Sequence, residues 1–398
     1  MDVSQSWQTP LQPLACEATL HATLILSESP LADRAFLGMP VALRVALSLA
    51  QAGVTELSLY GPEPRVQALR ERLQSDERLS LPLSLHVAEV PLDIVCLEDA
   101  LIAPELVRGL GLGEALLDAR GEAALVRVRR TCAPDPRALL QSAAQPQLAA
   151  ADSGKPGVLR LLNPTDRQAA DRQLFASLIK PSDGPVSRHL NRHVSRTITR
   201  LVIPLGTTPN AMTVVVLLTG LLGAYCASFP SPGLQLLGAA LYQLHSIIDG
   251  CDGEIARLTH RFGKHGALID SVVDDLCNAA FFFGLSLGVA RMYESQWPLA
   301  TGTLTAVAYA GVIALQYGAV LRSTGRGDKT KFWAAPSAER LTLFGVFKAL
   351  LRRDVFVLLI LIAVAIGLAQ AAVALFPLAA LGALVASSLR MLQSKGTA

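Results

Sequence analysis

Four aspartates stand at helical spacing inside a strongly apolar part of the sequence: Asp249, Asp252, Asp270 and Asp274. The first two share a helix face with Arg257, and the last two are one turn apart on a following helix. An ionised carboxylate in an apolar environment is costly unless it is paired, solvated or bound to a metal. Because all these ligands are oxygens, the pattern predicts a Mg²⁺ or Mn²⁺ site between two helices.

The spacing of the wider segment is D-x2-D-G-x2-A-R-x8-G-x3-D-x3-D, which we call the signature. It comprises Asp249, Asp252, Gly253, Ala256, Arg257, Gly266, Asp270 and Asp274. It resembles the signature of the CDP-alcohol phosphotransferase family, and no position departs from it. The resemblance implies a membrane enzyme that moves a substituted phosphate group from a CDP-linked donor to an acceptor hydroxyl, with release of CMP.

The resemblance also implies a role for each residue of the signature. Asp249, Asp252, Asp270 and Asp274 would bind Mg²⁺ or Mn²⁺, and the catalytic residues would be Asp274, as the base, and Asp270. The resemblance assigns the CDP moiety to Gly253, Ala256, Arg257 and Gly266. A TPNxxT segment beginning at Thr208, Pro209 and Asn210 resembles the family's sequence before its first membrane helix, where it lies beside the nucleotide.

Hydropathy divides the chain. Hydrophobic residues make up 51% of the sequence, and the apolar weight is concentrated after residue 200. We expect six transmembrane helices in an all-α membrane domain over residues 206–398, from the runs Met212–Ala227, Leu234–Ile248, Leu268–Ala290, Pro298–Leu321, Val355–Phe376 and Pro377–Leu392. Buried helices of a soluble α-protein are the alternative interpretation.

The basic residues between these runs predict the topology. Arginines and lysines gather between the second and third runs, between the fourth and fifth, and after the sixth, whereas the opposite loops hold only Arg291. Both termini and the signature should therefore lie on the cytoplasmic side of the inner membrane. The first residues lack the pattern of a signal peptide, so we expect residues 1–165 in the cytosol.

Residues 166–205 are expected to form a linker and an amphipathic interfacial helix. Val186, Leu190, Val194 and Ile198 share one face, and the opposite face carries Arg188, Arg192, Arg196 and Arg200. These arginines would face lipid phosphates or solvent, either as anchors or close to substrate. Candidates for binding a phosphorylated acceptor are Arg188, Arg322, Arg326 and Lys329. Arg322, at a helix end, is the first choice among them, and a purely topological role for it is an equally good interpretation.

Residues 1–165 are expected to form an α/β domain. The run ATLILSES predicts a strand, a helix should begin near Pro40, and a second strand should pass near Leu57. This part resembles a Rossmann-like sugar-phosphate nucleotidyltransferase domain, with Glu98 and Asp99 near the family's metal-binding carboxylates. The loop from Ser27 to Pro30 replaces the glycine-rich phosphate loop, which favours a degenerate domain.

The arrangement resembles fusions of the di-myo-inositol phosphate phosphate synthase type. The donor would be either CDP-diacylglycerol or a soluble CDP-alcohol, and the acceptor an alcohol or an alcohol phosphate. By analogy with the family we expect a homodimer in contact with membrane lipid, and no nucleic-acid partner. Two alternatives stay open: a bifunctional enzyme with an active cytidylyltransferase domain, and a non-enzymatic membrane scaffold or cation transporter.

Overall fold

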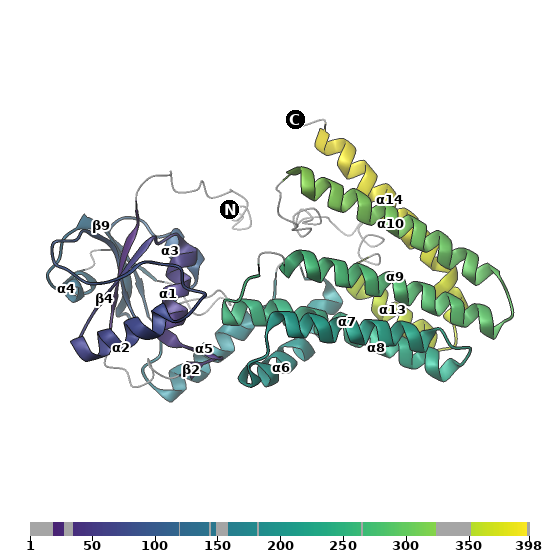
Figure 1. Cartoon of the computed structure of the whole chain (residues 1–398), viewed down its shortest axis with the longest axis horizontal. Coiled ribbons are helices and arrows are strands. Elements are labelled where there is room, and N and C mark those ends of the chain that lie inside the picture. Colours follow the sequence, from purple (N-terminus) through teal and green to yellow (C-terminus); the bar gives the residue numbers. More distant parts are fainter. Residues whose placement is uncertain are drawn as a thin grey trace. The chain divides into compact units, whose positions relative to one another are not determined.

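The computed structural model describes residues 19–27, 35–118, 120–142, 145–148, 158–180, 183–263, 266–323 and 352–395. The chain divides into two compact units, Met1–Ser177 and Leu178–Ala398. Figure 1 shows a sheet with helices in the first unit and helices alone in the second. The expected combination of an N-terminal α/β region with a helical C-terminal part is confirmed.

The first unit contains a mixed sheet of seven strands in the order β10-β8-β9-β6-β1-β4-β5. Strand β1 pairs in parallel with β4 and β6, while β9 runs antiparallel to both β6 and β8. The strands are β1 (His21–Ile25), β4 (Glu56–Tyr60), β5 (Leu83–Leu85), β6 (Leu92–Leu97), β8 (Glu114–Leu117), β9 (Ala123–Thr131) and β10 (Gln145–Leu148). All five residues of β1 are buried, as is typical of a central parallel strand.

Helices of the first unit follow local signals in the sequence. Helix α1 (Val41–Ala52) begins directly after Pro40 and ends at Gly53, whose φ of 106° only glycine adopts readily. The others are α2 (Glu63–Gln74), α3 (Pro104–Arg108), α4 (Pro136–Gln141) and α5 (Pro164–Ala176). Two short pairs complete the unit: β2 (Ala35–Phe36) with β3 (Met39–Pro40), and β7 (Ala100–Leu101) with β11 (Leu159–Arg160).

The second unit is built from helices around α8. A π-helical turn (Ser187–Asn191) leads into α6 (Arg192–Val202), and a short 3₁₀ turn (Ile203–Leu205) follows. The long helices are α7 (Pro209–Ala227), α8 (Pro232–Thr259), α9 (Gly266–Met292), α10 (Trp297–Ser323), α13 (Arg353–Ala365) and α14 (Ala369–Lys395). Helix α8 packs against α6, α7 and α13, while α9 packs against α7 and α10 (Figure 1).

Within the described residues, three helices are long and apolar enough to cross a membrane: Pro209–Ala227, Leu268–Met292 and Trp297–Leu315. Six spans are therefore not confirmed. The expected boundary between the last two runs, at Phe376 and Pro377, is wrong. The chain instead turns at Gly367, whose φ is 80°, and Pro377 lies inside α14. Helix α13 is only roughly 20 Å long, shorter than a hydrocarbon core of about 30 Å.

Helix α7 approaches its neighbours backbone to backbone. A Cβ atom on Gly238 of α8 would lie 2.7 Å from the carbonyl oxygen of Gly223 in α7. A Cβ atom on Gly284 of α9 would collide with the carbonyl group of Ala224. Only glycine allows this spacing, so these residues set the distance of α7 from the two helices that carry the signature.

Candidate active site

The signature occupies a helical hairpin. Asp249, Asp252 and Arg257 lie in the last turns of α8, which ends at His260 in a left-handed conformation. Asp270 and Asp274 lie in the first turns of α9. The end of one helix and the start of the next therefore bring the acids to the same end of the hairpin.

Two of these acids share an arginine that sequence reasoning missed. Arg353, the first residue of α13, donates from Nη1 to Asp249 Oδ2 at 3.1 Å, and its Nη2 contacts Asp274 Oδ1. Arg353 Nη2 also lies 3.1 Å from Nε2 of the buried His245. Its place at the start of an apolar run is a sequence signal, but Arg352 shares that place, so the signal does not single out Arg353.

The contacts of His245 orient its ring. Its Nδ1 lies 3.1 Å from the carbonyl oxygen of Val216, which can only accept, so Nδ1 carries a proton. Its Nε2 lies 3.1 Å from Arg353 Nη2 and 3.5 Å from Asp274 Oδ1.

The other two acids meet each other beside α7. The side chains of Asp252 and Asp270 lie within hydrogen-bonding reach of one another. Thr213 donates from Oγ1 to Asp252 Oδ2 at 3.1 Å, which joins the TPNxxT segment to the signature. Within that segment Thr208 caps α7 by accepting from the backbone N–H of Ala211 at 3.2 Å. Pro209 follows at the first helical position, and Asn210 is exposed.

The CDP-binding candidates of the signature border open space. A Cβ atom on Gly253 or Gly266 would meet nothing within 4 Å among the described residues. Arg257 donates from Nε to the carbonyl oxygen of Gly253 at 3.0 Å. Its Nη2 is buried and has no hydrogen-bond partner in the described part of the chain. Together with the half-buried Ala256, these residues leave room, and a free donor, for an anionic ligand.

The carboxylates suit a divalent cation in type. Two carboxylates within hydrogen-bonding reach, as Asp252 and Asp270 are, require a shared proton or a cation. As folded, however, the acids meet in pairs, with Arg353 between Asp249 and Asp274. No group of three acidic, histidine or cysteine side chains among the described residues is close enough to hold one ion. The metal role of the four acids therefore stays a prediction.

The candidates for binding an acceptor phosphate are scattered. Arg188 is exposed at the π-helical turn before α6. Arg322 lies in the last turn of α10, and its side chain is outside the described part of the chain. Arg326 and Lys329 also lie outside the described residues. Among the described residues, Arg353 contacts the acids, whereas Arg188 is exposed.

Lys180 is a second cation near the signature that the sequence did not single out. Burial, followed by the guanidinium groups of Arg257 and Arg192, lowers the pKa of Lys180. The carboxylates of Asp183 and Asp270 act in the opposite direction. Lys180 therefore lies within electrostatic range of both the phosphate-binding candidate Arg257 and the acids.

The expected orientation of the interfacial helix is wrong at Arg192. This side chain is buried, with the residue 8% exposed, whereas Leu190 and Val194 are 44% and 39% exposed. Arg188 and Arg200 are exposed as expected. The correction has a physical reason: α6 turns a polar face inward, where acids neutralise Arg192, and an apolar face outward, as suits a lipid surface.

In the first unit, the two acids expected near a metal site are already bound by arginines. Glu98 Oε1 accepts from Arg65 Nη2 at 3.0 Å and from the backbone N–H of Ser27 at 2.8 Å. Asp99 accepts from Arg160 twice, at 3.1 and 3.2 Å. Both acids are almost fully buried. These contacts engage Glu98 Oε1 and both carboxylate oxygens of Asp99, which a metal ion would have to compete for.

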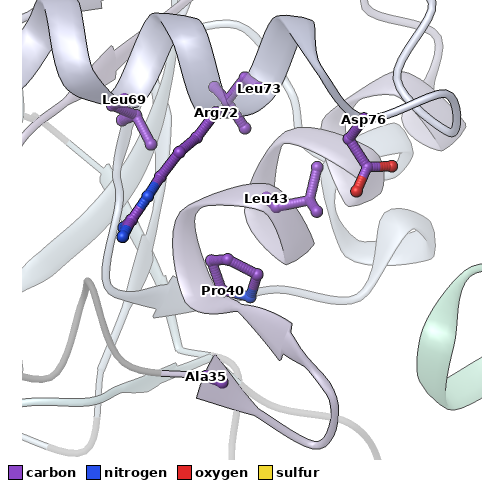
Figure 2. Close-up of a pocket in the computed structure, with 7 residues that line it drawn as sticks. All are labelled: Ala35, Pro40, Leu43, Leu69, Arg72, Leu73 and Asp76. Carbon is purple, nitrogen blue, oxygen red and sulfur yellow. The ribbon is translucent and has the colours of Figure 1, made fainter. Parts of the chain in front are cut away.

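A separate hollow of about 300 Å³ lies in the first unit, between α1 and α2. Figure 2 shows Leu69, Arg72 and Leu73 of α2 above Pro40 and Leu43. Ala35 and Asp76 complete its lining. None of the signature acids lines this hollow.

Comparison with known proteins identifies the C-terminal part. Residues 206–380 match the family model described as CDP-alcohol phosphatidyltransferase. The resemblance carried by the signature is thereby confirmed.

Particular relatives refine the picture. The chain is 38% identical over 135 residues to the "Bifunctional IPC transferase and DIPP synthase" of Thermococcus kodakarensis, covering 34% of this chain and 30% of that protein. It is 41% identical over 132 residues to the protein of the same name from Aquifex aeolicus, covering 33% and 30%. It is 33% identical over 91 residues to the "Archaetidylinositol phosphate synthase" of Pyrococcus horikoshii, covering 23% and 47%.

The matched segments thus span less than half the length of each of these three relatives. Among solved structures, the chain is similar to a Mycobacterium tuberculosis phosphatidylinositol phosphate synthase with CDP-DAG bound. The TM-score is 0.38 and the sequence identity 18%, over 50% of this chain and 92% of that one.

Proposed function

We propose that this protein is a membrane phosphotransferase that transfers a substituted phosphate group from a CDP-linked donor to an acceptor hydroxyl and releases CMP. The observation that carries the proposal is the complete signature on the α8–α9 hairpin, with acids of both helices converging around Arg353 and Thr213. A cation path would not require Arg257 and two open glycines beside the acids, which disfavours a transporter or scaffold.

The donor would be held at the end of the hairpin. Arg257, whose Nη2 is buried without a partner among the described residues, would donate to the diphosphate. Gly253, Ala256 and Gly266 would leave room for the nucleotide. Thr208, Pro209 and Asn210, at the start of α7, would lie beside it. The open space at both glycines supports this placement.

Asp249, Asp252, Asp270 and Asp274 would hold Mg²⁺ or Mn²⁺. When bound, the ion would neutralise the charge that develops on the departing CMP. Asp274 would accept the proton of the acceptor hydroxyl. As that proton leaves, the hydroxyl oxygen of the acceptor forms a bond to the distal phosphorus of the donor. The bond from that phosphorus to the oxygen shared with CMP breaks, and CMP leaves with the electron pair. Asp270 would share the catalytic role as a ligand facing Asp252.

The acceptor is proposed to be a phosphorylated polyol of the inositol phosphate type. The names of the relatives point to inositol phosphate chemistry. Arg353 supports the proposal from within the chain, because it places a guanidinium beside Asp274, where an acceptor phosphate would need a cation. The experiment below distinguishes a donor that carries diacylglycerol from one that carries a soluble alcohol.

A second candidate function is cytidylyl transfer by the first unit, which the word "bifunctional" in the relatives' name favours. The pairing of Glu98 with Arg65 and of Asp99 with Arg160 argues against it, because both carboxylates are engaged. We propose that the first unit is a degenerate nucleotidyltransferase-like domain.

The setting we propose is the cytoplasmic membrane, with the signature and both termini on the cytoplasmic side and with two copies paired in the membrane. The three apolar helices and the outward apolar side chains of the interfacial segment support membrane insertion. Lipid contact follows from the same surfaces.

The test measures CMP release by the purified full-length protein with Mg²⁺ or Mn²⁺. CDP-diacylglycerol and CDP-inositol are offered separately, each with inositol phosphate, inositol or glycerol phosphate. We expect CMP release to depend on the metal and on the acceptor, and to be fastest with inositol phosphate. No CMP from any combination would contradict the proposal. CTP with inositol phosphate, monitored for pyrophosphate, tests the first unit, and we expect none.

A further inference from the structure

Glu254 is a fully buried acid inside the signature segment that the proposed chemistry does not use. It lies two residues after Asp252 and is 0% exposed. Its Oε1 accepts from Arg192 Nη1 at 2.8 Å and from Ser195 Oγ at 2.7 Å. Its Oε2 accepts from Thr199 Oγ1 at 2.7 Å. All three donors belong to α6, so Glu254 fixes the interfacial helix to α8.

Arg192 also pairs with a second carboxylate, that of Asp183. Asp183 accepts from Arg192 Nε at 2.9 Å and from Nη2 at 3.0 Å. Asp183 also accepts from the backbone N–H of Lys180 at 2.9 Å. One buried guanidinium therefore joins two carboxylates, one at the start of the interfacial segment and one in α8. We call Asp183, Arg192 and Glu254 the clasp.

Helix α8 is shaped to admit the clasp. A Cβ atom on Gly250 would lie 2.7 Å from Arg192 Nη1, so a larger residue at this position would displace the guanidinium. The sulfur of Cys251 also lies 3.5 Å from the carbonyl oxygen of Ser195. Gly250, Cys251 and Glu254 form one face of α8.

The opposite face of the same turns carries the chemistry. At about 100° per residue, Asp249 and Asp252 project on the far side of α8 from Glu254, whereas Arg257 lies one turn along from Glu254 and within its electrostatic range. The clasp thus holds the rotation and height of α8 from the side opposite Asp249 and Asp252. Because burying the charges of Arg192 and Glu254 is costly unless both are fully paired, the clasp tolerates one arrangement of the two helices.

We propose that Glu254 is a positioning residue, which through Arg192 sets the orientation of the α8 turn that presents Asp249, Asp252 and Arg257. The change expected in CMP release rests on the proposed function, whereas the change expected in Mn²⁺ binding can be measured without it. It also assigns the interfacial helix a role beyond anchoring, because a displacement of α6 would be passed to the acids through Arg192.

The decisive variant is Glu254→Gln, which keeps the volume but removes the charge that pairs with Arg192. We expect kcat for CMP release to fall by about 10–100-fold and the Mg²⁺ concentration for half-maximal activity to rise by about 10-fold, as for outer-shell residues of metal sites. The KM for the donor should rise as well, because the same turn presents Arg257, which lies within electrostatic range of Glu254. Mn²⁺ binding without donor, measured by electron paramagnetic resonance, should weaken in parallel.

The matched control is Gln235→Leu. Gln235 is equally buried in α8, donates to the carbonyl oxygen of Phe229 at 3.3 Å, and lies near the opposite end of the helix. We expect it to lower the thermal unfolding temperature while leaving Mn²⁺ binding unchanged. Thr199→Val removes a single donor to Glu254, and should shift the Mg²⁺ requirement in the same direction by about 2–5-fold if Glu254→Gln does not fold.

The proposal is overturned if Glu254→Gln, or Thr199→Val in its place, loses stability like the control yet keeps its kcat and Mn²⁺ affinity. It is supported if Arg192→Gln shows the same loss as Glu254→Gln and the double variant loses no more than either single variant, because both substitutions act through one contact. Wild-type protein that binds Mn²⁺ but releases no CMP would contradict the proposed function alone, and the Mn²⁺ comparison would still decide the role of Glu254. Failure of wild-type protein to bind Mn²⁺ would overturn both.

Discussion

Arg353 and Asp249 form an ion pair between residues 104 positions apart, with Arg353 Nη1 3.1 Å from Asp249 Oδ2. The same guanidinium contacts Asp274, so one cation from the start of α13 joins the acids of α8 and α9. The charge balance of the site therefore depends on a helix outside the signature. Arg353 is the counter-charge of the acids as folded, and we propose that it is the ligand of an acceptor phosphate when substrates are present.

Replacing Arg353 should weaken use of a phosphorylated acceptor. We expect Arg353→Gln to lower kcat/KM for inositol phosphate by about 10²-fold, since a charge-assisted hydrogen bond contributes roughly 1.5–3 kcal/mol. Steady-state CMP release with inositol phosphate and with unphosphorylated inositol measures the effect. The loss should be confined to the phosphorylated acceptor.

The neighbouring Arg352 provides the control, because its exposed side chain lies 3.6 Å from Asp354 rather than at the signature acids. Arg352→Gln should leave kcat/KM within about 2-fold. An equal loss with both acceptors in Arg353→Gln would show that this arginine acts on the acids and not on the acceptor.

Asp274→Asn should nearly abolish turnover. The substitution removes the group proposed to accept the acceptor's proton, and general bases contribute about 10²–10⁴-fold to rate. CMP release under saturating donor and acceptor measures kcat. Asp275→Asn is the matched control, since Asp275 instead accepts from the hydroxyl groups of Tyr309 at 2.9 Å and Tyr317 at 3.3 Å. Turnover that survives in Asp274→Asn as well as in Asp275→Asn would remove the base from the mechanism.

Arg160→Gln should destabilise the first unit. The substitution leaves Asp99, which is 0% exposed, without the side chain that donates to both of its oxygens. Breaking a buried pair in this way costs about 3–5 kcal/mol. Hydrogen exchange of the full-length protein should show faster exchange in β6 and β7. The more exposed pair of Arg120 with Asp166 is the comparison, and Arg120→Gln should cost less than about 1 kcal/mol. Equal exchange in both variants would mean that Asp99 is not held by Arg160.

Acid should weaken the contribution of Asp183 to stability. Burial would raise the pKa of this carboxyl, but the hydrogen bonds from Arg192 and from the backbone of Lys180 outweigh it, and the pKa is lowered. A lowered folded-state pKa gives a stability contribution that is full above the unfolded-state value of about 3.9 and declines as pH falls below it. Arg192 and Lys180 are charged groups that face Asp183, and Arg257 lies within its electrostatic range.

The measurement compares the unfolding temperatures of the wild type and Asp183→Asn in detergent. The difference between them should be constant from pH 7 to about pH 5 and shrink below about pH 4. A difference that persists unchanged at the lowest pH would mean that the charge of Asp183 does not contribute.

The sequence predicted the hairpin of acids because fixed spacing on two helices places side chains without knowledge of the tertiary structure. Asp249 and Asp252 lie on α8, and Asp270 and Asp274 on α9, as the periodicity indicated. The first strand, the helix after Pro40 and the strand through Leu57 were equally local in origin.

Contacts between distant segments could not be predicted in the same way. Basic residues near membrane helices are ordinarily topology signals, so nothing local distinguished Arg353 from its neighbours. Arg192 repeats with the other arginines of α6, but its burial depends on Glu254 of α8 and Asp183, which periodicity does not reveal. Pro377 was expected to separate two helices, whereas the left-handed conformation of Gly367 determines where the chain turns.

Because of the backbone contacts of α7, its positions differ in the substitutions that they tolerate. The side chains of Val214, Leu218 and Leu222 are more than half exposed, and any apolar residue of similar size would serve there. Where α7 crosses α8, a Cβ atom on Gly223 would lie 3.1 Å from the carbonyl oxygen of Gly238, and one on Gly238 would lie 2.7 Å from the carbonyl oxygen of Gly223. The same two helices carry Thr213 and Asp252 toward their other ends. A methyl group added at this crossing would push the helices apart and so change the distance between Thr213 and Asp252. Substitutions in α7 are thus least restricted on its exposed side and most restricted where its backbone faces α8 and α9.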